Sequence, residues 1–369
     1  MVVLTFFTNF AEKYKPSMSR NESSTLNIIR FAMMISVLML HSYTSVRTCQ
    51  DVSSLPVYFV ITRLFSWQFG ELGVPVFFVI SGYLFFKGYQ QTFDSYTSKL
   101  KRRFHSLLVP YVLWISIFLV VFYIAECFPV VRESFNEGRI LVHNYTWNDF
   151  LRAFWAAKQS EYPFVIPLWY VRNLMVMVII APLVYALISR LNHYLLYVMA
   201  LIWFFCSRWY CEANTIFFFC FGAYFSLHDM SLVKSVSQYR RTIVIWFLLF
   251  SFLDLAFMNY SISFWFHRAE IMFGTPFVLI VISCLVDKGY VRDYPSIFAS
   301  CFFVYVTHEP LLRFIRRFSL KYIEESSDCQ MIISYFASVT IVLLVVYFTY
   351  WILSKYFPIV MRVLSGGRG

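Results

Sequence analysis

Charged residues are scarce in this sequence. Only 14% of its 369 residues are Asp, Glu, Lys or Arg, while 60% are hydrophobic, and the mean hydropathy is +0.64. Soluble domains carry about a quarter charged residues, so this composition excludes an ordinary soluble domain and indicates a polytopic membrane protein. Internal repeats, low-complexity tracts and a separate soluble domain are lacking as well.

Cysteine motifs for metal binding are also lacking. None of the eight cysteines has CxxC spacing, and we expect no metal site. Two interpretations remain for the five cysteines at or near the predicted outer face: disulfides in an oxidising compartment, or free thiols that pack as small apolar residues. These five are Cys49, Cys127, Cys206, Cys211 and Cys329.

The net charge is +11, from 31 basic and 20 acidic residues. In a membrane protein Lys and Arg collect on the cytoplasmic side and set the orientation, so this excess does not indicate nucleic-acid binding. Aromatic residues make up 21% of the chain, which is typical of lipid-facing surfaces and interfacial belts. We therefore expect the lipid bilayer as a partner and no nucleic acid, and we leave a homo-oligomer open.

The hydrophobic runs predict an all-α, polytopic integral membrane protein with about ten transmembrane helices, because a helix needs about 20 apolar residues to cross the bilayer. They also divide the chain into a cytoplasmic N-terminal segment (1–25), a transmembrane domain (26–357) and a cytoplasmic C-terminal tail (358–369). The expected spans are 26–46, 55–88, 106–125, 168–189, 193–207, 212–228, 242–259, 268–287, 296–318 and 331–357.

Basic residues beside the spans predict their orientation. Lys13, Lys15 and Arg20 precede the first span, and a basic run at 99–103 precedes the third, so both termini are expected in the cytoplasm. One basic cluster falls on the predicted outer side instead. This cluster consists of Arg313, Arg316, Arg317 and Lys321. Either the predicted number of spans is wrong by one in this region, or the cluster belongs to a functional site and does not set the orientation.

The second span, 55–88, contains Gly70, Gly73 and Pro75 in an otherwise apolar run. This pattern predicts one broken span, or a half-span followed by a full one. Broken backbone at membrane depth is tolerated where it is buried in protein or lines a cavity. An ordinary proline kink at Pro75 is the alternative.

Arg30 and His41 are the ionisable residues of the first span. They are eleven positions apart, almost three helical turns, so they share one face at a separation of about 16 Å. A charged group inside the bilayer costs at least about 2.5 kcal/mol, so such residues usually face the protein interior and are functional. The alternative is that Arg30 reaches the headgroups and His41 caps the far end of the span.

Four segments together resemble the acyltransferase 3 family of integral membrane acyltransferases. They are Arg30 and His41 with ten residues between them, GVPVFFVISGYL (73–84), KLKRRFHSLLVPYVLW (99–114) and FFVYVTHEPLL (302–312). The order and spacing of the segments are more specific than any one of them, and the resemblance covers nearly the whole chain.

The resemblance implies transfer of an acyl group, most often acetyl, from cytoplasmic acyl-CoA (acetyl-CoA) to a hydroxyl of an envelope polysaccharide, its lipid-linked precursor or a small molecule. Similar proteins are bacterial inner-membrane O-acetyltransferases, so the cell (inner) membrane is the expected location. The resemblance also implies that His41 is the essential catalytic residue and that Arg30 is its partner.

The residues suit this chemistry. Acyl transfer to a hydroxyl needs a base that works near neutral pH, and His41 provides one. Direct attack of the hydroxyl and an acyl-imidazole intermediate both remain open. The developing oxyanion needs hydrogen-bond donors, for which Ser42, Ser81 and Tyr83 are candidates.

Acyl-CoA carries several phosphate charges and therefore needs a basic rim. Arg30, Arg102 and Arg103 lie on the predicted inner side and are the candidate cofactor-binding residues. For Arg102 and Arg103 the alternative role is orientation alone. Tyr170 is a candidate for stacking on a sugar or adenine ring, or a member of the interfacial aromatic belt.

His308 and Glu309 form the second catalytic candidate. A His in an apolar span, followed by an acid and a Pro, can orient a substrate hydroxyl or a water; the alternative is a polar pair satisfied by neighbouring helices. The other histidines fall in loops or at span ends, where we expect most to be solvated: His105, His143, His193, His228 and His267.

The chain departs from the family pattern at two places. Many members have an acid shortly before the first-span Arg, where this chain has Asn27, which weakens the interpretation that a neighbouring carboxylate holds Arg30. The basic run also lacks an Arg directly before its Pro, where residues 107–109 are Leu, Leu and Val. That difference concerns the contacts to CoA.

Two rival functions remain at this stage. One is a glycan transporter or exporter without acyl-transfer chemistry, which would use a broken span and intramembrane charges for passage; the lack of inverted repeats speaks against it. The other is a catalytically inactive relative that serves as an assembly subunit.

Overall fold

The structure is a computed structural model that describes residues 20–44, 56–129, 132, 140–158, 160–206, 210–323 and 327–367. These residues form helices and contain no β-strand. Each of the ten expected spans contains helix, so the all-α, polytopic membrane fold is confirmed. The N-terminal segment, up to residue 19, lies outside the described residues.

Five helical segments are long and apolar enough to cross a membrane: Glu22–Tyr43, Pro56–Phe86, Phe93–Ala125, Ser263–Asp287 and Asp328–Tyr356. A sixth candidate is the pair Ile166–Ile179 and Ala181–Leu191, which is bent by 66°. The other expected spans coincide with helices that are shorter or that carry more charge. The number ten therefore remains a prediction.

The helices have the following bounds: α2 (Arg20–Thr44), α3 (Pro56–Thr62), η1 (Arg63–Phe69), η2 (Gly70–Leu72), α4 (Gly73–Phe86), α5 (Phe93–Arg103), η3 (Phe104–Leu108), α6 (Val109–Ala125), η4 (Val142–Asn144), α8 (Trp147–Arg152), η5 (Ile166–Leu168), α9 (Trp169–Ile179), α10 (Ala181–Leu191), α11 (His193–Phe205), α12 (Tyr210–Leu227), α13 (Leu232–Ser237), α14 (Arg240–Ala256), α15 (Ser263–Asp287), α16 (Pro295–Ala299), α17 (Cys301–Leu320), α18 (Asp328–Tyr356) and α19 (Pro358–Leu364).

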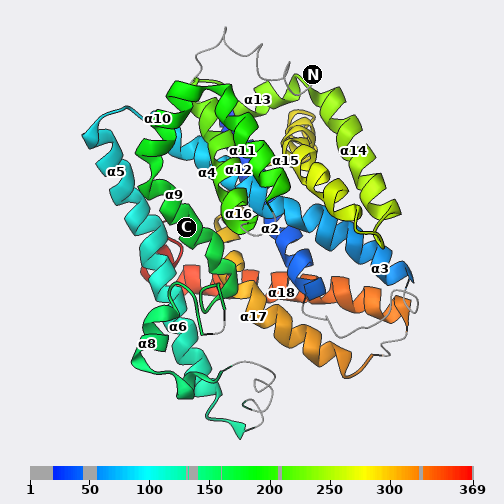
Figure 1. Cartoon of the computed structure of the whole chain (residues 1–369). Helices are drawn as coiled ribbons and strands as arrows, with labels where there is room; N and C mark the ends of the chain where they lie inside the picture. The colour runs from blue at the N-terminus through cyan, green and yellow to red at the C-terminus, as the bar shows by residue number, and fades with distance from the viewer. Residues whose placement is uncertain are drawn as a thin grey trace.

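Helix α2 lies in the middle of the bundle and packs against α4, α15, α17 and α18 (Figure 1). Its apolar side chains Ile29, Met34 and Leu38 are fully buried although Ile29 and Leu38 lie on opposite faces of the helix. The first span is therefore surrounded by protein, so its polar side chains face other helices.

The second span is continuous helix from Pro56 to Phe86, so the expected break at membrane depth does not occur. The chain accommodates its glycines and Pro75 by a change of hydrogen bonding: a π-helical stretch, η1, is followed by one 3₁₀ turn, η2. Pro75 falls in the first turn of α4, where a missing N–H is tolerated. π-Helical segments often occur at functional sites.

Helices α4 and α12 cross with their backbones in contact. A Cβ atom added at Gly82 would lie 2.0 Å from the carbonyl oxygen of Phe219, and one at Gly222 would lie 1.9 Å from that of Val79. Only glycine permits such an approach, and close crossings of this kind are common between membrane helices.

The expected cytoplasmic tail begins with a short helix, α19, which packs on the bundle. Trp114 donates a hydrogen bond from Nε1 to the carbonyl oxygen of Leu364 at 3.0 Å, and Met361 is buried. This part of the tail is therefore docked against α6. The seven described cysteines are free, and Cys49 lies outside the described residues, so no expected disulfide is found among the part of the chain that the structure describes.

Candidate active site

Two histidines from distant parts of the sequence meet inside the bundle. His41 lies in the last turn of α2 and His308 lies in α17; their ring centroids are 5.2 Å apart with an angle of 54° between the planes. His308 is fully buried, and His41 is partly exposed. The structure thus brings together the two histidines that the sequence offered as separate candidates.

The hydrogen bonding of His308 fixes which ring nitrogen carries a proton. Its Nδ1 lies 3.1 Å from the carbonyl oxygen of Val304, which only accepts, so Nδ1 is the donor. The buried Nε2 has no hydrogen-bond partner among the described residues. In a neutral ring this Nε2 carries a basic lone pair, so it can accept a proton or a hydrogen bond.

Two hydroxyl groups hold the turn of α2 that carries His41. The hydroxyl oxygens of Ser66 and Tyr335 lie 2.8 and 3.1 Å from the carbonyl oxygen of Met39 and 2.7 Å from each other, so one hydroxyl donates to the carbonyl and the other can donate to its partner hydroxyl. Both side chains are fully buried. The neighbouring Ser42 donates to the carbonyl oxygen of Tyr335 at 3.5 Å. These contacts set the position of His41 relative to α18 and η1.

A cavity of about 760 Å³ opens beside α2 and is lined by residues of α2, α4, α9, α16 and α17 together with Arg103 at the end of α5. Arg30 and Arg103 both line it and give it a positive wall. Arg30 donates to the amide oxygen of Asn27 at 3.4 Å. Arg102 is exposed and is not among the lining residues, so the two arginines of the basic run differ in position.

Hydroxyl groups also line this cavity. Tyr170 and Ser81 are hydrogen-bonded at 2.8 Å and both line the wall, together with Tyr305. The ring of Tyr305 lies 6.4 Å from that of His308, which in turn contacts His41. Tyr305 therefore lies between the cavity and the histidine pair, and neither His41 nor His308 is a lining residue.

The carboxylate of Glu309 does not bond to His308. It forms an ion pair with Arg313, one turn further along α17. Arg316, from the same basic cluster, is fully buried and donates to Ser334 at 2.6 Å. At least two of the four basic residues that contradicted the predicted orientation are therefore engaged within the protein, and they need not indicate a cytoplasmic side.

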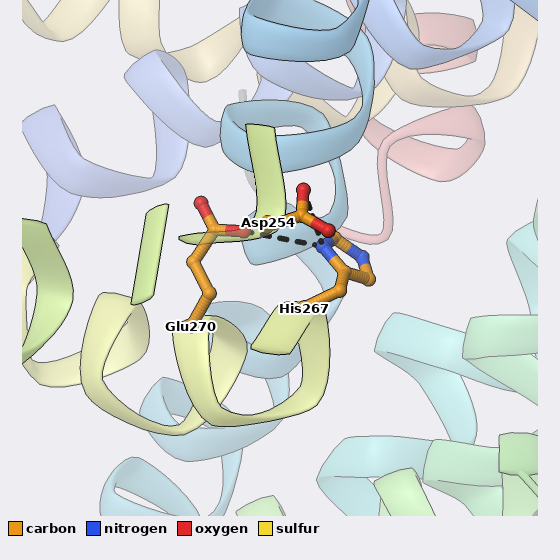
Figure 2. A group of neighbouring side chains, drawn as sticks. All are labelled: Asp254, His267 and Glu270. Atoms are coloured by element: carbon orange, nitrogen blue, oxygen red, sulfur yellow. Dashed lines mark hydrogen bonds and ion pairs between the residues drawn. The ribbon is translucent and has the colours of Figure 1, made fainter. Parts of the chain in front are cut away.

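A second polar cluster, which the sequence did not predict, joins α14, α15 and η1. Figure 2 shows Asp254 of α14 facing His267 and Glu270 of α15. His267 Nδ1 lies 3.2 Å from Glu270 and 3.8 Å from Asp254, and its Nε2 lies 3.0 Å from Glu71. His267 is thus buried among acids, and it is an exception to the expectation that most of these five histidines are solvated.

This cluster is an ion network and does not fit a resident metal. Both oxygens of Asp254 accept hydrogen bonds from Arg63, and Ser263 and Gln68 donate to them as well, at 2.7 and 3.3 Å. A metal ion on Asp254 would have to displace these donors. The spacing of His267 and Glu270, three residues apart in an apolar helix, is the one signal in the sequence that could have revealed the cluster.

The chain matches the family model described as "Acyltransferase domain" (acyltransferase 3) over residues 24–353. It is similar to the succinoglycan biosynthesis protein ExoH of Rhizobium meliloti (strain 1021), with 25% identity over 236 residues, which is 63% of this chain and 61% of that protein. The chain thus covers less than two thirds of the length of this curated relative. No solved structure matches it. Because the family model spans nearly the whole helical bundle, the protein belongs to the acyltransferase 3 family of integral membrane proteins.

Proposed function

We propose that this protein is an acyltransferase that moves an acyl group, most often acetyl, from cytoplasmic acyl-CoA to a hydroxyl of an envelope polysaccharide or its lipid-linked precursor. The observation that carries the proposal is the contact between His41 and His308 beside a cavity with two arginines in its wall. The name of the relative, a succinoglycan biosynthesis protein, supports a polysaccharide acceptor.

The donor enters the cavity of Arg30 and Arg103. Coenzyme A carries phosphate groups, and guanidinium groups bind phosphate through charge-assisted, paired hydrogen bonds. The thioester then lies toward Tyr305, the lining residue whose ring contacts His308. The cavity volume of about 760 Å³ is in the range of sites for cofactors and small molecules.

The acceptor hydroxyl loses its proton to an imidazole nitrogen of the histidine pair as its oxygen attacks the thioester carbonyl. The carbon–sulfur bond breaks, and the leaving thiolate takes the proton from the imidazolium, which gives the ester and free coenzyme A. Ser81 and Tyr170 are the hydroxyl donors of the cavity for the intermediate oxyanion. The partly exposed His41 faces the acceptor, and the site lies in the inner cell membrane with both termini cytoplasmic.

The test uses the purified full-length protein in lipid nanodiscs with radiolabelled acetyl-CoA and a polysaccharide acceptor. The wild type transfers label to the glycan, and His41→Ala loses this transfer while its unfolding midpoint stays close to that of the wild type. An exporter would leave all label on coenzyme A. Full transfer by His41→Ala would overturn the catalytic role of the histidine.

A further inference from the structure

A second cavity lies between α14 and α15, at the end of the pair where α14 begins and α15 finishes. Its volume is about 540 Å³. Arg240 and Arg241 of α14 and Lys288, which follows α15, form its polar rim together with Tyr290. None of its lining residues within the described chain is acidic.

The three basic side chains at this rim are exposed. None of them takes part in an ion pair that the described residues form, in contrast to Arg63 and Arg313, which pair with acids. Three unpaired cations around one hollow attract an anion, and phosphate is the anion that arginine binds best. Two of the three cations, Arg240 and Arg241, belong to the first turn of α14.

The wall of this cavity below the rim is apolar. Val244 and Ile245 of α14 face Ile280 and Val281 of α15 across it. Ile245 is 63% exposed, which is unfavourable in water and natural against a hydrocarbon chain. A soluble phosphate would use the rim alone, whereas a ligand with a phosphate at one end and an acyl chain at the other would use the whole cavity.

We propose that this cavity binds an anionic phospholipid, with its phosphate between Arg240, Arg241 and Lys288 and one acyl chain along the apolar wall of α14 and α15. Basic pockets between membrane helices are known to bind such headgroups. The site lies close in sequence to the first cavity, since Pro295, seven residues after Lys288, lines that cavity. The proposal does not depend on the acyl-transfer reaction.

The test measures lipid binding to the full-length protein in nonionic detergent. Phosphatidylglycerol or phosphatidylcholine is titrated into the protein, bound lipid is counted by native mass spectrometry, and the unfolding midpoint is recorded. We expect phosphatidylglycerol to bind at least about tenfold more tightly, because each basic group near an anionic headgroup adds appreciable binding energy. The triple variant Arg240→Gln, Arg241→Gln, Lys288→Gln should lose this preference.

The matched control is Lys234→Gln with Arg292→Gln, which removes exposed cations outside the cavity and should keep the preference. Val244→Trp fills the wall without changing charge and should weaken phosphatidylglycerol binding, so the proposal remains testable if the triple variant fails to fold. Equal binding of both lipids, or an equal loss in the control, would overturn the proposal. Competition by inorganic phosphate or coenzyme A at equal concentration would also overturn it, in favour of a soluble ligand.

Discussion

The imidazole rings of His41 and His308 contact each other at a centroid distance of 5.2 Å, although they lie near opposite ends of the sequence. One ring belongs to a helix end held by hydroxyl groups, and the other has its Nδ1 hydrogen fixed on Val304. The pair therefore combines a positioned ring with a ring of defined tautomer, which is the arrangement that proton transfer requires.

His308→Ala should lower kcat for acetyl transfer by about 10²–10⁴-fold and leave KM for acetyl-CoA nearly unchanged, because a general base acts in the transition state. The double variant His41→Ala, His308→Ala should be little worse than either single one if the rings act as a unit. His193→Ala, in α11, is the control and should retain activity. Full activity of His308→Ala would show that this ring is structural. Steady-state kinetics in nanodiscs give these values.

Arg103→Ala should raise KM for acetyl-CoA by roughly tenfold or more, since a hydrogen bond to a charged group contributes about 1.5–3 kcal/mol. Arg102→Ala should have a much smaller effect, because Arg102 is exposed and lies outside the cavity lining. Isothermal titration with coenzyme A checks both variants without turnover. An equal loss in the two variants would favour a diffuse electrostatic effect over a site.

Gly82→Ala should prevent normal packing of α4 on α12. The new Cβ would meet the Phe219 carbonyl at 2.0 Å, and backbone cannot yield as a flexible side chain can. Gly88→Ala is the comparison, because its Cβ meets nothing within 4 Å and costs only the left-handed strain of φ +61°, about 1–2 kcal/mol. The yield of monodisperse protein after detergent extraction should fall sharply for Gly82→Ala and slightly for Gly88→Ala.

Arg63→Met should lower the free energy of unfolding by about 3–5 kcal/mol, since it leaves the buried Asp254 carboxylate without its cation. Adding Asp254→Leu should recover much of this loss, because the uncompensated charge is removed. The measurement is the unfolding midpoint in detergent. If the double variant is no more stable than Arg63→Met, the ion pair is not the source of the loss.

Asp149, outside the membrane-spanning helices, gives a prediction for pH. The Lys158 ammonium, and then the amide and hydroxyl of Thr146, lower the pKa of Asp149 from 3.8 to about 2. Because the pKa is lower in the folded than in the unfolded state, ionised Asp149 stabilises the folded segment at pH values above the unfolded pKa. This stabilisation is lost as the pH falls toward 2. Hydrogen exchange in 146–158, corrected for intrinsic rates, should therefore stay slow at pH 3. In Lys158→Gln it should accelerate at a higher pH than in the wild type.

Much of the fold was predictable from the sequence because hydrophobic length and basic flanks are local properties. Each expected span contains helix. Arg30 lines the cavity and His41 contacts His308, so both side chains face the protein interior. The prediction of a break in the second span was wrong. Around Gly70 and Gly73 the chain changes from π-helical to 3₁₀ hydrogen bonding and stays helical. Composition does not distinguish these two responses.

The contacts between spans were not predictable. The sequence named His41 and His308 one by one, yet nothing in it states that α2 and α17 pack together. The ion network of Glu71, Asp254 and His267 was missed for the same reason, since its members lie on three helices. The difference between Arg102 and Arg103 likewise depends on which side of α5 faces the cavity.

The glycine crossing of α4 and α12 has a consequence for how substrate enters. With backbone against backbone at this crossing, no layer of side chains separates the two helices there, so we expect them to move together. Phe77, Ser81 and Leu84 on α4 are the part of the cavity wall that belongs to this helix pair. If the proposed donor needs a wider cavity, we expect the widening to come from lining residues outside this helix pair, such as those of α16 and the start of α17.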